Sequence, residues 1–242
     1  MNYKGTGLSV MEMSHRSQDF IRIAEKCRAD LKVLLDIPEN FTVFMLNGGA
    51  TNQFDAICYN LLEEESDTGN YLTTGYWSNL AIKEGSKHCR PNEVANNSDS
   101  RCTSIPEPEE WNISESAKFF HYCDNETIAG LEFNEFPVEM VPEGQTLIAD
   151  MSSNLLTKPI DWTKLGMVYA GASKNVGPAS LTFVIVRNDL IPGQRADTPL
   201  LCNWEAFAKS PNTFYNTPAC WAIYVCGLNI AHSIEQGGIP YY

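Results

Sequence analysis

The stretch MVYAGASKNVGPASLTFVIVR (residues 167–187) decides the fold. Its two ends, Met167–Ala170 and Leu181–Arg187, are apolar runs of strand length, and the second is almost wholly β-branched or aromatic. Such runs are typical of strands buried on both faces of a sheet. The segment between them is rich in Gly, Ala and Ser and carries Lys174. We therefore expect two buried strands joined by a link whose backbone can approach a bound molecule closely.

Outward from this stretch, apolar runs alternate with helical patterns. Further strands are predicted at Phe41–Leu46, Asn70–Thr74, Lys118–Tyr122 and Thr146–Asp150, and helices at Thr51–Leu62, Asn79–Lys87 and Pro218–Gln236. Thr51 is the expected N-cap of the first helix, and Gly237-Gly238 the stop of the last. The alternation predicts an α/β fold with a mainly parallel, mixed sheet flanked by helices. Residues 91–112, rich in Pro, Asn, Ser and Glu, are predicted to form a loop-rich insertion at the surface.

Composition limits the possible partners and the compartment. The chain has 242 residues, which suits one large α/β domain, and 17 Lys+Arg against 30 Asp+Glu give a formal charge of −13. This acidic balance, with no basic run, argues against nucleic acid as a partner. No stretch of about 18 apolar residues predicts a membrane span. The eight cysteines form no C-x-x-C pair, and several lie in apolar runs, which favours reduced thiols in the cytoplasm.

No metal site is expected. The four histidines show no metal-ligand spacing with one another or with the cysteines; they are His15, His88, His121 and His232.

Lys174 and Asp150 are the residues most suggestive of chemistry. A desolvated lysine beside a glycine-rich turn can lose its proton and attack a carbonyl to form a Schiff base. The alternative interpretation of the same segment is an ordinary surface lysine in a strand–turn–strand link. Asp150 ends an apolar run, and a carboxylate at the end of a buried strand is expected to pair with a cation. The pyridinium nitrogen of pyridoxal 5'-phosphate (PLP) is such a cation, and PLP needs an acid partner to act as an electron sink.

Other predicted strand ends supply groups that suit the same cofactor. The turn GGAT (residues 48–51) leads into a helix, where free N–H groups and the helix dipole favour a phosphate, although many plain turns look the same. Trp77 is either a ring that stacks on the cofactor or a core side chain, and Thr127 offers a hydroxyl to a phenolic oxygen. Because open α/β sheets bind ligands at the carboxyl ends of their strands, these groups together indicate a PLP site.

Six strings resemble the phosphoserine aminotransferase family, PLP enzymes of the class-V aminotransferases with the aspartate-aminotransferase fold (fold type I). They are GLSVMEMSHRS (7–17), GYWS (75–78), HYCDNET (121–127), ADMSSN (149–154), GASKNVGP (171–178) and YNTP (215–218). The resemblance covers essentially the whole chain in order. It implies transamination between 3-phosphooxypyruvate and glutamate, giving O-phosphoserine and 2-oxoglutarate in L-serine biosynthesis.

The resemblance also implies roles at matching positions around the cofactor ring. Lys174 would form the Schiff base with PLP and shuttle the proton of the 1,3-shift, and Asp150 would pair with the pyridine nitrogen. Trp77 would stack on the ring, and Thr127 would bond the phenolic oxygen.

The remaining implied roles concern phosphate and substrate. Ala50 and Thr51 would bind the cofactor phosphate through backbone and hydroxyl. Asn216 and Thr217 would reach across the interface of a homodimer with shared active sites, to the neighbouring subunit's phosphate. The pair formed by His15 and Arg16 would hold the substrate's phosphate or carboxylate, a task that suits the bidentate fork of arginine.

Three departures from the family pattern matter. Ser173 stands where the family usually has Gln, and its shorter hydroxyl is expected to weaken cofactor binding. A family segment with a Gly-Pro motif has no counterpart before Met1, and the C-terminal small domain, with an Arg for the substrate carboxylate, has none after Tyr242. We therefore expect residues 1–242 to be the PLP-binding large domain with the C-terminal small domain missing.

Three functions remain open at this point. The first is a working PLP-dependent aminotransferase. The second is a truncated, catalytically impaired relative that keeps the fold and PLP binding and acts as a dimerisation partner. The third, another fold-type-I reaction such as desulfuration or lyase chemistry, is disfavoured by the phosphate-suited string SHR (residues 14–16).

Overall fold

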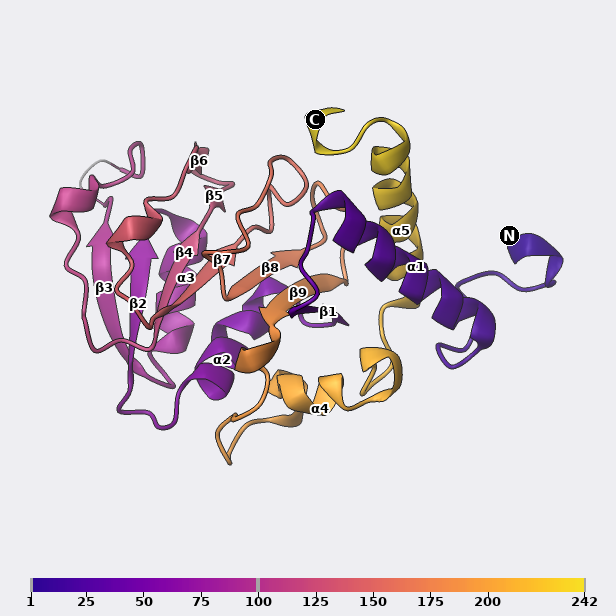
Figure 1. Cartoon of the computed structure of the whole chain (residues 1–242), viewed down its shortest axis with the longest axis horizontal. Helices are drawn as coiled ribbons and strands as arrows, with labels where there is room; N and C mark the ends of the chain where they lie inside the picture. The colour runs from indigo at the N-terminus through magenta and orange to yellow at the C-terminus, as the bar shows by residue number, and fades with distance from the viewer. Residues whose placement is uncertain (1, 99–100, 242) are drawn as a thin grey trace.

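A seven-stranded sheet forms the centre of the computed structural model, in the part of the chain that it describes, residues 2–98 and 101–241 (Figure 1). The strands are β1 (Phe41–Leu46), β2 (Thr68–Thr73), β3 (Arg90–Asn96), β4 (Phe119–Cys123), β7 (Thr146–Asp150), β8 (Met167–Gly171) and β9 (Thr182–Arg187). Their spatial order is β1-β9-β8-β7-β4-β2-β3. A separate short hairpin pairs β5 (Asn125–Glu126) with β6 (Leu131–Glu132).

The sheet is parallel apart from β9, which runs antiparallel to both β1 and β8. Every residue of β9 except Arg187 is buried, which confirms that this apolar run is covered on both faces. Because β8 and β9 are antiparallel neighbours, residues 172–181 form a tight connection at the carboxyl end of β8, and Lys174 lies in it.

Helices cover both faces of the sheet. The longer ones are α1 (Gln18–Leu34), α2 (Gly49–Leu61), α3 (Tyr76–Gly85) and α5 (Cys220–Glu235), and α4 (Trp204–Ala208) is a single short turn. Helices α1 and α5 lie against each other and share a core with one sheet face, where Phe20 and Ile223 are fully buried (Figure 1). The opposite face packs on α2 and α3 through residues such as Phe54 and Ala81. Burying one large apolar side chain such as that of Phe54 stabilises the fold by roughly 2 kcal/mol.

Local signals explain where the outer helices begin and end. The Ser17 hydroxyl accepts a hydrogen bond from the Phe20 N–H (3.2 Å) and so caps α1, a helix that the sequence analysis did not delimit. After α5, Gly237 and Gly238 take φ values of 114° and 79°. These left-handed conformations suit glycine, so the predicted stop signal is confirmed.

Three expectations were wrong. Residues 91–112 are not loop throughout, because residues 90–96 form β3, a parallel neighbour of β2 at the edge of the sheet. An edge strand tolerates Pro91, which cannot donate to a ladder. Thr51 is not an N-cap either: α2 begins two residues earlier, after Gly48, whose φ of 99° is left-handed. The helix predicted from Asn79 likewise begins three residues earlier, at Tyr76.

Candidate active site

A cavity of about 230 Å³ opens where the parallel strands end. It is lined by Gly49, Ala50, Thr51, Trp77, Cys123, Asn125, Asp150, Ser152, Gly171, Ser173 and Lys174. Six of these residues were candidates from the sequence: Ala50, Thr51, Trp77, Asp150, Ser173 and Lys174. The structure therefore brings these six candidates together in one cavity at the strand ends.

Lys174 faces the indole of Trp77 across this cavity. Its Nζ lies 5.3 Å from the centroid of the ring, within the range of cation–π attraction. The connection that carries it is tied at its base by the Ala172 N–H, which donates to the Leu181 carbonyl (2.8 Å). The lysine side chain is exposed, so the desolvation expected from the glycine-rich setting is not seen in the chain alone.

Asp150 is a buried carboxylate at the floor of the cavity. It ends β7 with 3% exposure, and its Oδ1 accepts hydrogen bonds from the Ser152 hydroxyl (2.6 Å) and N–H (2.9 Å). Burial raises the pKa of this carboxyl, while the Ser152 bonds and the Lys174 ammonium work in the opposite direction. The Ser152 hydroxyl also accepts a hydrogen bond from the Gly171 N–H (3.0 Å), which ties Asp150 to the end of β8.

The start of α2 forms an anion-binding corner of the cavity. Gly48 and Gly49 have φ values of 99° and 69°, so the chain enters the helix through a left-handed turn. Within the described residues no side chain caps this helix, and its first turn contains no acid. Its first N–H groups and the positive end of its dipole therefore face the cavity beside Ala50 and Thr51.

The buried Glu126 holds Trp77 in place, and the sequence analysis missed it. Its carboxylate accepts hydrogen bonds from the Trp77 N–H (3.0 Å), the Ser78 N–H (2.8 Å) and the Ser78 hydroxyl (2.6 Å). It thereby caps α3, in place of a side chain from the N-cap residue itself, Gly75. A Cβ at Gly75 would stand 2.6 Å from the Glu126 carboxyl carbon, which explains the glycine there. The position of Glu126 shortly after a strand end was a signal that could have found it.

Five sequence candidates lie outside the cavity lining. Thr127 is exposed, and Asn125 of the same string lines the cavity instead. Asn216 lines an adjoining cavity of about 190 Å³ together with Gly48. The Thr217 carbonyl accepts a hydrogen bond from Asn47 Nδ2 (3.0 Å), so this segment flanks the anion-binding turn from outside.

The other two, His15 and Arg16, precede α1. His15 is half-buried and Arg16 is exposed, and neither side chain lines the cavity of this chain.

The residues present fit PLP. An aromatic ring needs a flat apolar wall, and Trp77 supplies one whose Nε1 is buried without a partner among the described residues. A phosphate needs open N–H donors, which α2 supplies. A ring nitrogen that carries a proton needs a buried carboxylate, and Asp150 is one. An amine for an imine link is present in Lys174.

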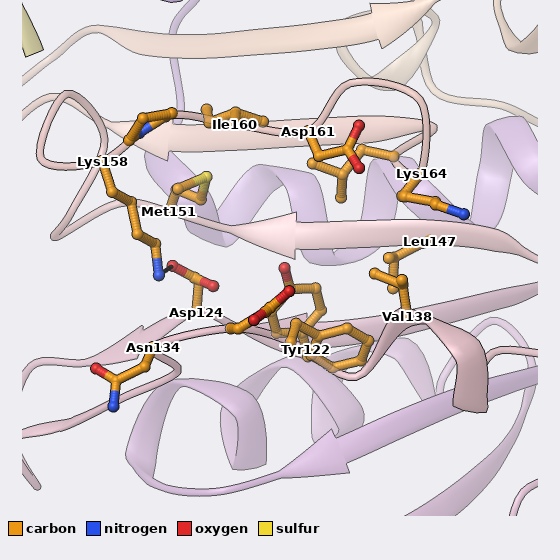
Figure 2. Close-up of a pocket in the computed structure, with 14 residues that line it drawn as sticks. Tyr122, Asp124, Asn134, Val138, Leu147, Met151, Lys158, Ile160, Asp161 and Lys164 are labelled. Atoms are coloured by element: carbon orange, nitrogen blue, oxygen red, sulfur yellow. Dashed lines mark ion pairs between the residues drawn. The ribbon is translucent and has the colours of Figure 1, made fainter.

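A second, larger cavity of about 470 Å³ lacks one of these groups, the open start of an α-helix (Figure 2). It contains two lysines, and Figure 2 shows Lys158 extending to Asp124, with Nζ–Oδ2 at 2.7 Å, while Lys164 lies at the other end. No N-terminus of an α-helix lies among its lining residues, so the phosphate has no counterpart site there. The smaller cavity is therefore the candidate active site.

Two further findings concern the described residues, 2–98 and 101–241. They contain no group of three or more His, Cys, Asp or Glu side chains placed to hold a metal ion. None of their helices is both long enough and apolar enough to cross a membrane.

The aminotransferase class-V family model matches residues 1–240. Phosphoserine aminotransferase 2, chloroplastic, of Arabidopsis thaliana is 44% identical over 238 residues, which are 98% of this chain and 56% of that protein. The phosphoserine aminotransferase of Acinetobacter baylyi is 45% identical over 240 residues, 99% of this chain and 65% of that protein.

Solved structures of phosphoserine aminotransferases are similar to this chain over nearly its whole length. The phosphoserine aminotransferase from Bacillus circulans subsp. alkalophilus superposes with a TM-score of 0.93 at 36% identity, over 100% of this chain and 65% of that one. A PLP-bound phosphoserine aminotransferase from Trichomonas vaginalis gives 0.90 at 37% identity, over 98% of this chain and 66% of that one. The chain thus spans between about half and two thirds of the length of these relatives.

Proposed function

Because the chain belongs to the class-V aminotransferase family, we propose that it is a PLP-dependent phosphoserine aminotransferase. It would exchange the amino group between glutamate and 3-phosphooxypyruvate, giving 2-oxoglutarate and O-phosphoserine in L-serine biosynthesis. The relatives that carry this name, at 36 to 45% identity, support the proposal.

One observation carries the proposal. Lys174, Trp77 and the buried Asp150 meet in a single cavity, next to an uncapped helix N-terminus. These are an amine, an aromatic wall, a carboxylate and an anion-binding corner, which together match the four recognisable parts of PLP. Each alone has an ordinary structural explanation, but their convergence within about 230 Å³ does not.

When bound, PLP supplies an electron sink for the electron pair that a substrate keeps on losing its α-proton. Asp150 is buried, so water does not screen its negative charge, and this charge would hold a proton on the ring nitrogen. The amine of Lys174 would take the α-proton and deliver it to the neighbouring carbon, and a placed general base of this kind contributes about 10²–10⁴-fold. Trp77 would exclude water from one face of the site, and the start of α2 would fix the phosphate so that Lys174 stays in reach.

The residues outside the cavity have proposed roles as well. Thr127 would bond the phenolic oxygen from the rim, beside Asn125. Asn216 and Thr217 would serve the phosphate of a neighbouring subunit, since they flank the anion-binding turn without entering this chain's own cavity. His15 and Arg16 would bind the anionic groups of the substrate in a homodimer with shared sites.

We propose further that residues 1–242 form the PLP-binding large domain. A cytoplasmic location fits the eight cysteines, all of which are free thiols in the described structure. The alternative of an impaired dimerisation partner is not favoured, because six of the sequence candidates line one cavity, with Ser173 in the place of the family's Gln.

Two measurements test the proposed function. Purified protein mixed with PLP should develop a visible absorption band that Lys174→Ala abolishes and the control Lys164→Ala, a lysine of the larger cavity, leaves unchanged. Adding phosphoserine in a single turnover should then convert this band to that of the pyridoxamine form. A protein with no such band, or one whose band also disappears in the control, would contradict PLP binding at Lys174. A band that phosphoserine leaves unchanged would contradict the aminotransferase activity.

A further inference from the structure

A buried tyrosine and histidine stand behind Asp150 in the sheet. Asp150 on β7 is directly paired with Tyr169 on β8, and β4, which carries His121, flanks β7 on its other side. Tyr169 is 0% exposed and His121 is 1% exposed. Their side chains meet on the face covered by α2 and α3, where His121 Nε2 lies 2.7 Å from the Tyr169 hydroxyl.

Tyr169 is the direct neighbour of Asp150 across the β7–β8 pair, and its hydroxyl lowers the pKa of the Asp150 carboxyl. The three residues therefore lie in one line, His121–Tyr169–Asp150, which leads from the core to the cavity. All three side chains are buried, so packing fixes their positions.

The direction of the hydrogen bonds follows from the unused nitrogen of His121. Its Nδ1 is buried and has no partner among the described residues. If Nδ1 carried the proton, its N–H would be a buried donor without an acceptor. The Tyr169 hydroxyl would then have to donate its only hydrogen to Nε2 and would have none for Asp150. If Nε2 carries the proton, His121 donates to the Tyr169 hydroxyl, whose own proton is then available to Asp150, and only the Nδ1 lone pair stays without a partner. The second arrangement leaves fewer groups unsatisfied and is the favoured one.

We infer that Tyr169 and His121 are positioning residues that keep Asp150 ionised and aimed at the ring nitrogen of the cofactor. This inference rests on the proposed function. Tyr169 acts through Asp150, since it does not line the cavity. Burial keeps His121 neutral by lowering its pKa to about 3, so it serves as a hydrogen-bond donor of fixed direction.

The groups that face Asp150 define what else could affect its charge. They are Lys174 from the connection after β8, Cys123 from the end of β4, Ser152 from the segment after β7, and Tyr169 itself. Tyr169 can be removed as a donor without disturbing the others, because phenylalanine keeps the ring.

The test uses Tyr169→Phe in the full chain loaded with PLP labelled with ¹⁵N in its ring. In the wild-type protein the nitrogen signal should report a protonated ring nitrogen. In Tyr169→Phe the proton should move toward Asp150, so the signal shifts toward that of a neutral pyridine. The dissociation constant for PLP should also rise about tenfold, or 1.4 kcal/mol, the lower end for a hydrogen bond to a charged group.

Tyr122→Phe is the matched control. Tyr122 is a buried tyrosine of β4 that lines the larger cavity together with Asp124 and does not line the candidate active site, so its variant should leave both measurements unchanged. His121→Leu is a second test, should Tyr169→Phe fail to fold, and should give a smaller shift in the same direction.

An unshifted nitrogen signal and unchanged affinity in a folded Tyr169→Phe, or in His121→Leu where Tyr169→Phe does not fold, would overturn the inference. That result differs from a failure of the proposed function, in which the wild-type protein itself would not bind PLP.

Discussion

Replacing Glu126 tests how the site holds its aromatic wall. This fully buried carboxylate receives three hydrogen bonds from the first turn of α3 and so fixes the backbone of Trp77. Glu126→Ala removes the acceptor and leaves the Trp77 and Ser78 N–H groups unpaired. Glu126→Gln keeps one carbonyl oxygen, but its amide N–H₂ group must then face one of the donors.

The magnitudes follow from the bonds lost. Hydrogen bonds to charged groups are worth about 1.5–3 kcal/mol each, and losses within one network add to less than their sum. We therefore expect Glu126→Ala to lower the free energy of unfolding by about 3–5 kcal/mol. Glu126→Gln, which loses one bond and gains one donor–donor contact, should cost about 1–2 kcal/mol.

The assay is urea unfolding of the cofactor-free chain followed by circular dichroism, together with the dissociation constant for PLP. Both variants should also bind PLP more weakly, because Trp77 loses its support. Glu132→Gln is the control: this glutamate lies on the neighbouring strand of the same hairpin, its side chain is 39% exposed, and its loss should cost less than about 1 kcal/mol. Equal stability of Glu126→Ala and the control would refute the assigned role.

Three other changes have expected outcomes. Burial lowers the pKa of folded His121 to about 3 against an ordinary 6.5, so the unfolded chain binds more protons between these values and stability is lost as pH falls below 6.5. Unfolding measurements at pH 7 and pH 5 should show that His121→Leu removes about 2 kcal/mol of this loss. An equal loss in both proteins would contradict the burial of a neutral His121. Gly171→Ala should weaken PLP binding with little change in unfolding free energy, because the added methyl stands 3.6 Å from the Ala50 backbone nitrogen at the anion-binding corner; unchanged affinity by titration would mean that the phosphate sits elsewhere. Ser173→Gln should tighten PLP binding several-fold in the same titration, because the longer amide reaches further toward the phosphate, and weaker binding would remove residue 173 from the phosphate site.

The sheet and the centre of the site could be predicted because their signals are local. The apolar runs ending at Asp150 and preceding Lys174 are strands by composition alone, and parallel strands bring their carboxyl ends together whatever their order. Trp77 followed a strand in the same way. The unpredicted β3 contains Pro91, and it exists through pairing with β2, a contact that its own composition does not reveal.

Other parts of the site depend on contacts between distant segments. Glu126 looks like a surface acid in sequence and is buried only because the start of α3 supplies three donors. Tyr169 and His121 lie 48 residues apart, and their bond follows from the strand order. Thr127 and Asn125 are neighbours in one string, yet the hairpin of β5 and β6 places only Asn125 in the cavity.

Mapping the covalent attachment of PLP tests the central claim most directly. The protein would be incubated with PLP, reduced with borohydride to fix any imine, digested, and its peptides identified by mass spectrometry. The account predicts that the label lies on Lys174 at a stoichiometry near one per chain, and that Asp150→Asn lowers it at limiting PLP. A label on Lys158 or Lys164 in the larger cavity, or one spread over many surface lysines, would contradict the account.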